Sequence, residues 1–121
     1  MVIFVNLEDY FEKLEEMLAK SEIYLCVSYD ADLLAMDSLT GYASAWADFA
    51  KKHENLKIEI RTKSARMEMW EQCEPASNVI YAFTVAPEEI IAASEKKTPS
   101  AKARIACAAE GVKRGFAVRL C

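Results

Sequence analysis

The feature that most constrains the fold is a regular alternation between short apolar runs and longer segments with helical spacing. Four runs have the length and composition of strands, and residues 2–6 (VIFVN) also look extended. The four are residues 22–28 (EIYLCVS), 57–63 (KIEIRTK), 78–85 (NVIYAFTV) and 115–121 (GFAVRLC). The intervening helical patterns cover residues 7–18, 38–53, 65–73, 88–95 and 98–111. Strands separated by helices imply right-handed crossovers and a parallel sheet, so we predict an α/β fold with about four parallel strands.

Polar residues mark where several helices begin. Asn6 is placed to cap the first helix, and Thr98 is placed to cap the last one, with Pro99 in its first turn. The second helix is expected to begin near Ser38. Its predicted inner face consists of Leu39, Tyr42, Ala45, Trp46 and Phe49. With 121 residues, 53% of them hydrophobic, the chain can bury one core, so residues 1–121 are expected to form a single domain.

Charge and hydropathy exclude several classes of protein. A net charge of −4 gives no general attraction to nucleic-acid phosphates. The scattered basic residues are interpreted as solvated helix faces; they are Lys96, Lys97, Lys102, Arg104, Lys113 and Arg114. No apolar run is long enough to span a bilayer, and the N-terminal apolar stretch lacks the features of a signal peptide. We therefore expect a cytoplasmic protein without a membrane partner.

The four cysteines do not have metal-binding spacing. Cys26, Cys73, Cys107 and Cys121 lie at least 14 residues apart, so no metal site is predicted. Cys26 and Cys107 sit in apolar patterns typical of buried free thiols, whereas Cys73 and Cys121 are candidates for exposure. The single histidine, His53, is interpreted as a solvated cation at a helix end, and no catalytic triad can be built around it. Glycine-rich phosphate loops are absent from the sequence.

Candidate functional residues follow the strands, because the carboxyl ends of parallel strands gather at one edge of the sheet. Ser28, Tyr29, Asp30 and Asp32 could line a ligand site, although turns and helix caps need the same residue types. Lys63 ends the second of the four strands, where its ammonium could hold a carboxylate or phosphate or could simply be exposed. Near the end of the next strand lies Thr84, whose hydroxyl could bind a ligand or a nearby backbone group.

Several segments in this order resemble the central part of the spore photoproduct lyase family of radical S-adenosylmethionine proteins. The segments are IFVNLEDYFEKLEEML, YDADLLAMDSLTG, LKIEIRTKSA, NVIYAFTVAPEEII and TPSAKARIACAAEGVKRGFAVRL. Together they cover essentially the whole chain. The resemblance implies a partial (β/α) barrel and a [4Fe–4S] cluster on a CxxxCxxC loop. That cluster cleaves S-adenosylmethionine to a radical that reverses a thymine photodimer in DNA.

Some positions that are functional in the family keep a suitable residue in this sequence, and others do not. Lys63 matches the lysine that faces the carboxylate of S-adenosylmethionine, and Thr84 stands where a serine contacts the same ligand, so both are predicted to bind this cofactor. Tyr29 stands where the family has its catalytic cysteine, and Ala31 where it has a serine that holds the cofactor. The catalytic residues are therefore unknown. The cluster loop would precede residue 1, so the cluster itself is not expected in this chain.

Two functions are consistent with this sequence. In the first, the chain is a fragment or truncated relative of a radical S-adenosylmethionine lyase of the DNA photoproduct repair family, inactive alone. In the second, it is a stand-alone α/β binding or interaction module without radical chemistry. Nucleic acid is a partner only by family resemblance. Part of a barrel leaves two sheet edges and an inner face that we expect to be apolar, so a homo-oligomer joined through an edge or the inner face is predicted.

Overall fold

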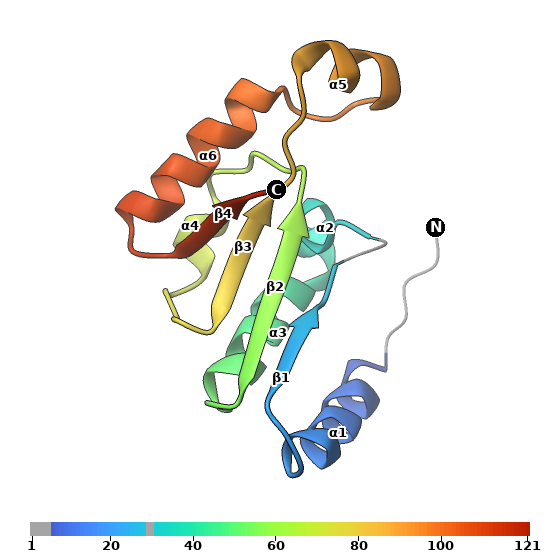
Figure 1. Cartoon of the computed structure of the whole chain (residues 1–121), viewed down its shortest axis with the longest axis vertical. Coiled ribbons are helices and arrows are strands. Elements are labelled where there is room, and N and C mark those ends of the chain that lie inside the picture. Colours follow the sequence, from blue (N-terminus) through green and yellow to red (C-terminus); the bar gives the residue numbers. More distant parts are fainter. Residues whose placement is uncertain (1–5, 29–30) are drawn as a thin grey trace.

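Four parallel strands form one sheet in the computed structural model, which describes residues 6–28 and 31–121. The strands are β1 (Ile23–Cys26), β2 (Leu56–Thr62), β3 (Val79–Phe83) and β4 (Ala117–Leu120). They pair in sequence order, β1-β2-β3-β4, and every pair is parallel (Figure 1). The predicted α/β fold with four parallel strands is therefore confirmed. The extended segment predicted at residues 2–6 lies outside the described residues except for Asn6, which immediately precedes α1.

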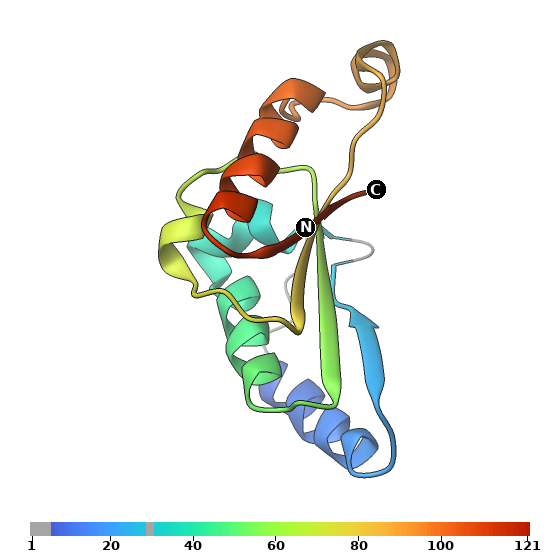
Figure 2. The same cartoon turned by 60° about the vertical axis from the view of Figure 1, so that its left-hand side comes forward.

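The helices gather on one side of this sheet (Figure 2). They are α1 (Leu7–Leu18), α2 (Leu33–Thr40), α3 (Tyr42–Lys51), α4 (Met69–Gln72), α5 (Glu88–Ser94) and α6 (Ala101–Lys113). The short helix α5 is the exception, because it lies beyond the carboxyl ends of the strands (Figure 1). Among the described residues, no helix covers the opposite face of the sheet, which we call the inner face (Figure 2).

The core lies between the sheet and its helices. Alternate strand residues such as Ile58, Ile60 and Phe83 are fully buried on this side. Trp70 of α4 packs on the rings of Tyr81 and Phe116, and its indole N–H donates to the Cys107 carbonyl at 3.0 Å. This packing fixes α6 against the sheet. No described helix is long and apolar enough to span a membrane.

The segment expected to hold one helix from Ser38 holds two. Helix α2 begins directly after Asp32, whose carboxylate accepts the Ala35 N–H at 3.1 Å, and ends at Gly41. Gly41 has φ +65°, a left-handed conformation that favours glycine and ends a helix. Because the chain turns there, Leu39 does not face the core: it is 72% exposed, and its predicted place on the inner face of the helix was wrong.

Two predicted caps also differ from the structure. Helix α6 is capped by the Ser100 hydroxyl, which accepts the Ala103 N–H, whereas the Thr98 hydroxyl donates to Glu95. Asn6 does occupy the cap position of α1, but its side chain donates to the Asp9 carboxylate and makes no capping bond to the backbone. Competition among side chains only three positions apart thus decides which polar residue caps.

The inner face of the sheet is polar, contrary to the expected apolar surface. Tyr24, Glu59, Arg61 and Arg119 make hydrogen bonds and ion pairs there, across strands β1, β2 and β4. Cys26 shares this face by strand alternation and is half-buried, so its predicted full burial was wrong. A charged inner face removes the apolar driving force that motivated the prediction of self-association through it.

Candidate functional site

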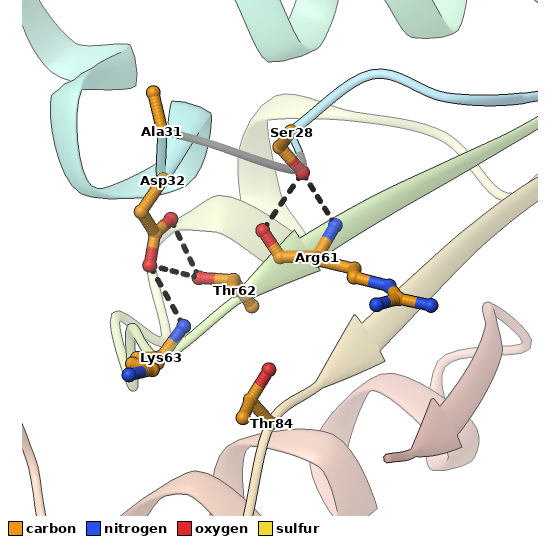
Figure 3. A pocket seen from close by; sticks show the side chains of 7 residues that line it. All are labelled: Ser28, Ala31, Asp32, Arg61, Thr62, Lys63 and Thr84. Carbon is orange, nitrogen blue, oxygen red and sulfur yellow. Dashed lines mark hydrogen bonds between the residues drawn. The ribbon is translucent and has the colours of Figure 1, made fainter.

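A hollow of about 470 Å³ lies at the carboxyl ends of β1, β2 and β3 (Figure 3). Its lining residues are Ser28, Ala31, Asp32, Arg61, Thr62, Lys63 and Thr84. The parallel register brings these residues together, because it pairs β1 with residues 33 positions later and β2 with residues 21 positions later (Ile23 with Leu56, Ile58 with Val79). Lys63 and Thr84, the two predicted cofactor-binding residues, thus border the same hollow. Tyr29 and Asp30 lie outside the described residues.

Asp32 serves the structure of the site. Besides capping α2, its carboxylate accepts the Thr62 hydroxyl at 2.8 and 3.0 Å and the Lys63 N–H at 2.7 Å. These bonds tie the start of α2 to the end of β2 (Figure 3). A carboxylate that already accepts these hydrogen bonds has little capacity left to bind a ligand. Of the two roles that the sequence left open for Asp32, ligand binding and helix capping, the structure shows capping.

Ser28 extends the sheet beyond the end of β1. Its hydroxyl donates to the Arg61 carbonyl at 2.8 Å and accepts the Arg61 N–H at 2.5 Å (Figure 3). The side chain is buried, and its hydroxyl makes the two hydrogen bonds to β2 that backbone groups of a neighbouring strand would otherwise make. Ser28 therefore shapes the wall of the hollow.

Lys63 is paired with an acidic residue that sequence reasoning did not identify. Its ammonium lies 2.8 Å from Glu95 Oε1, just after α5. The other carboxylate oxygen of Glu95 pairs with Arg104 and accepts the Thr98 hydroxyl at 2.9 Å. Hydrogen bonds from Arg104 and Lys63 lower the pKa of Glu95 to about 2. Glu95 is thus ionised, and its carboxylate occupies the ammonium of Lys63, the group that is predicted to hold the carboxylate of a ligand.

Arg104 is a buried structural cation. Predicted to lie on a solvated helix face, it is instead 0% exposed. Its guanidinium donates to the Pro99 carbonyl at 3.0 Å and the Thr84 carbonyl at 2.9 Å, in addition to the Glu95 carboxylate. A buried charge needs such partners, and this one joins the end of β3 to the segment before α6. Because Thr84 is held through its backbone, its hydroxyl is positioned at the hollow, 3.8 Å from the sulfur of Cys121.

Arg61 is the second cation of the hollow and was not predicted as a site residue. Its Nε lies 2.6 Å from Oε1 of Glu59, which also accepts the Tyr24 hydroxyl and pairs with Arg119. Burial favours a higher pKa for Glu59, but the hydrogen bonds from Tyr24 and Arg61 and the charge of Arg119 hold that pKa below its ordinary value. The i, i+2 spacing of Arg61 and Lys63 on one strand could have revealed this shared face.

The remaining candidates lie elsewhere. His53 follows α3 and packs at a tilt against the Phe49 ring, with centroids 4.5 Å apart, so it is half-buried rather than solvated. Cys107 is buried, as predicted; Cys121 is exposed and Cys73 is half-buried. Within residues 6–28 and 31–121, no group of three histidine, cysteine or acidic side chains could hold a metal ion. The described residues therefore do not fit an iron–sulfur cluster.

Neither protein-family models nor curated proteins match this chain, but solved structures do. A cysteine-to-serine mutant of spore photoproduct lyase matches with a TM-score of 0.86 and 18% identity over 98% of this chain. The chain shares its fold with spore photoproduct lyase. The same lyase complexed with dinucleoside spore photoproduct gives equal values, and a double mutant with bound S-adenosylmethionine and that photoproduct gives 0.86 and 17%.

This likeness confirms the partial barrel and the predicted resemblance at the level of the fold. The chain spans 36% of the length of the matched lyase structures. It thus corresponds to about a third of that protein, and the activity and ligands of the whole lyase are proposals for this chain.

Proposed function

We propose that the hollow binds S-adenosylmethionine, in a protein of the radical class to which spore photoproduct lyase belongs. Lys63 would pair with the ligand's carboxylate, and the Thr84 hydroxyl would hydrogen-bond to the same ligand. One observation carries the proposal: Lys63 and Thr84, from neighbouring strands, line a single hollow. The fold adds support, because a matched lyase structure holds S-adenosylmethionine.

The hollow fits such a ligand in size and charge. Its volume of about 470 Å³ lies within the range of roughly 300–1,000 Å³ usual for small-molecule sites. Arg61 and Lys63 are the two cations of its lining, which suits an anionic group. Glu95 would give up Lys63 to the ligand's carboxylate and keep its bonds to Arg104 and Thr98.

The described residues would bind and orient the cofactor. S-adenosylmethionine supplies, when bound and reduced, the carbon-centred radical of this class. Reduction needs an iron–sulfur cluster, and the described residues do not fit one, so no reaction step is assigned to them. We infer that the isolated chain binds the cofactor without cleaving it. The DNA photoproduct bound in the matched lyase is a candidate substrate by that likeness alone.

A stand-alone binding module is the second candidate. It is favoured by the ion pair of Lys63 with Glu95, which already satisfies the lysine, and by Ala31 in place of the family's serine. Such a module would bind a different anion at the hollow, and S-adenosylmethionine would not bind.

Isothermal titration calorimetry with S-adenosylmethionine distinguishes the two functions. An exposed charge contact contributes about 1 kcal/mol, so Lys63→Ala is expected to weaken binding about fivefold. The matched control is Lys57→Ala, an exposed lysine on the same strand that does not line the hollow, and it is expected to leave binding unchanged. Binding that is absent at millimolar ligand, or that weakens equally in both variants, contradicts the proposal.

Two further parts of the proposal concern assembly. We propose that residues 1–121 form one domain, which predicts a single cooperative unfolding transition. We also propose a dimer or higher oligomer joined through the edge strands β1 and β4, because unpaired strand edges favour association. A monomer in sedimentation equilibrium at micromolar concentration would contradict the second part.

A further inference from the structure

A continuous series of bonded groups joins the two predicted cofactor-binding residues behind the hollow. The Lys63 ammonium lies 2.8 Å from Glu95 Oε1, and the other carboxylate oxygen of Glu95 pairs with Arg104. Arg104 Nη1 in turn donates to the Thr84 carbonyl at 2.9 Å. Lys63 and Thr84 line the hollow (Figure 3), whereas Glu95 and Arg104 do not. The acidic residue therefore acts on the hollow through the residues that line it.

The carboxylate of Glu95 is fixed on the side away from the lysine. Arg104 is 0% exposed, so its guanidinium has no water to replace the carboxylate, and separating this pair would leave a buried charge unpaired. The Thr98 hydroxyl donates to the same oxygen at 2.9 Å. Glu95 is ionised at neutral pH, since its partners lower its pKa to about 2. It is therefore a fixed negative charge that must stay on Arg104.

The ammonium of Lys63 is the group that can change partner. Its side chain is 43% exposed and ends in a point charge on a flexible four-carbon stem, so it can turn from one acceptor to another. The backbone of Lys63 stays in place meanwhile, because its N–H donates to the Asp32 carboxylate at 2.7 Å. A carboxylate that binds in the hollow must therefore take this ammonium from Glu95.

We propose that Glu95 is an internal competitor for the carboxylate of the ligand, and that it sets how strongly the hollow favours ligands that carry one. This inference rests on the proposed binding of S-adenosylmethionine. The ligand's carboxylate replaces Glu95 on Lys63, while Glu95 keeps Arg104 and Thr98. Because the lysine contact is exchanged and not newly gained, the carboxylate adds little affinity in the parent protein, and the adenosyl part of the ligand supplies most of it.

Competition predicts a change of affinity opposite in sign to that of general electrostatics. S-adenosylmethionine carries a sulfonium and an ammonium against one carboxylate, so it is a net cation, and the loss of a nearby acidic residue would by charge alone weaken its binding. Glu95→Gln instead frees Lys63 and should tighten binding. The gain is about fivefold, the scale of one partly exposed ion pair that no longer has to be broken. Lys63→Ala leaves the ligand's carboxylate beside Glu95 without the lysine, and so weakens binding.

Calorimetric titration with S-adenosylmethionine, and separately with its decarboxylated form, tests the inference. Glu95→Gln is expected to bind S-adenosylmethionine about fivefold tighter and the decarboxylated ligand no tighter than the parent does. Glu95→Asp provides a second variant that keeps a carboxylate for buried Arg104. Its shorter side chain cannot hold both cations, so Lys63 is released and a smaller gain is expected. Glu89→Gln, an exposed residue in the first turn of α5, is the matched control and should bind both ligands like the parent.

Two results would overturn the inference while leaving the cofactor site intact. One is S-adenosylmethionine binding that is unchanged or weaker in the Glu95 variants that circular dichroism shows to be folded. The other is equal tightening for both ligands, because Glu95 would then act through the shape of the hollow and not through Lys63. Absence of S-adenosylmethionine binding in the parent and in the folded variants would instead contradict the cofactor site itself, and the inference with it.

Discussion

Replacement of Glu95 by glutamine should destabilise the protein in a pH-dependent way. The partners of Glu95 lower its pKa to about 2 from an ordinary value of 4.5. That difference corresponds to about 3 kcal/mol, since each pKa unit is about 1.4 kcal/mol. The side chain is 11% exposed, so solvent screens the interaction little. A similar magnitude follows from the environment of Arg104. Glu95→Gln would leave this buried guanidinium without its carboxylate, and removing one partner of a buried pair costs about 3–5 kcal/mol.

The sign follows from the lowered pKa. Above pH 4.5 the carboxylate is ionised in both the folded and the unfolded chain, and its full stabilisation is present. As the pH falls from 4.5 through about 2, the unfolded chain binds a proton first and the stabilisation is lost. Glu95→Gln should therefore be about 3 kcal/mol less stable than the parent at pH 7, and nearly equal to it near pH 2.

Urea unfolding at pH values between 7 and 2, followed by circular dichroism, measures this difference. Glu89→Gln, an exposed acidic residue in the first turn of α5, is the matched control and should change stability little at any pH. A difference for Glu95→Gln below about 0.5 kcal/mol at pH 7, the scale of an ordinary surface substitution, would refute the reasoning. A difference that does not shrink on acidification would also refute it.

Three other outcomes are expected. Gly111→Ala should lower the free energy of unfolding by about 1–3 kcal/mol, since the added Cβ would lie 2.5 Å from the Trp70 ring; unchanged urea unfolding would contradict the packing. Asp32→Ala should cost about 1–2 kcal/mol through the lost cap of α2, and Asp32→Asn should recover only part of this in the same assay, because its amide can accept the Ala35 N–H but its nitrogen cannot accept the Lys63 N–H. Burial raises the pKa of the Cys107 thiol, so in native protein iodoacetamide should modify exposed Cys121 first and Cys107 last, as read by mass spectrometry.

The strands were predictable because their signals are local. Apolar runs of strand length set β1 to β4 within a few residues, and helical spacing located α1 and most of α6. Boundaries were not predictable where neighbouring polar residues compete for one cap or where a distant strand decides. Thr98 has the sequence of a cap, yet it donates to Glu95, and Ser100 caps instead. For Asp32 the sequence favoured a cap or turn over a ligand, and only the placement of β2 beside it shows the bonds that decide this.

The site was predictable only in part for the same reason. Lys63 and Thr84 could be named because the carboxyl ends of parallel strands share one edge. Glu95 follows the short helix α5, well past the carboxyl end of β3, so the argument from strand ends did not point to its pair with Lys63. Arg104 looked like one more surface cation, because its burial depends on three acceptors from separate segments. The inner face was expected to be apolar because the chain resembles part of a barrel, although the alternation of charged and apolar residues in 57–63 indicates that one face of that strand is more polar.

A titration of ¹⁵N-labelled protein with S-adenosylmethionine, followed by nuclear magnetic resonance, tests the central claim most directly. Backbone amide signals of Lys63, Thr84 and Ser28, which all line the hollow, are predicted to shift together and to saturate. Asn78, at the opposite end of the sheet just before β3, should not move. Shifts confined to residues near Asn78, or no shift of the three hollow residues at millimolar ligand, would contradict the claim that this hollow holds the cofactor.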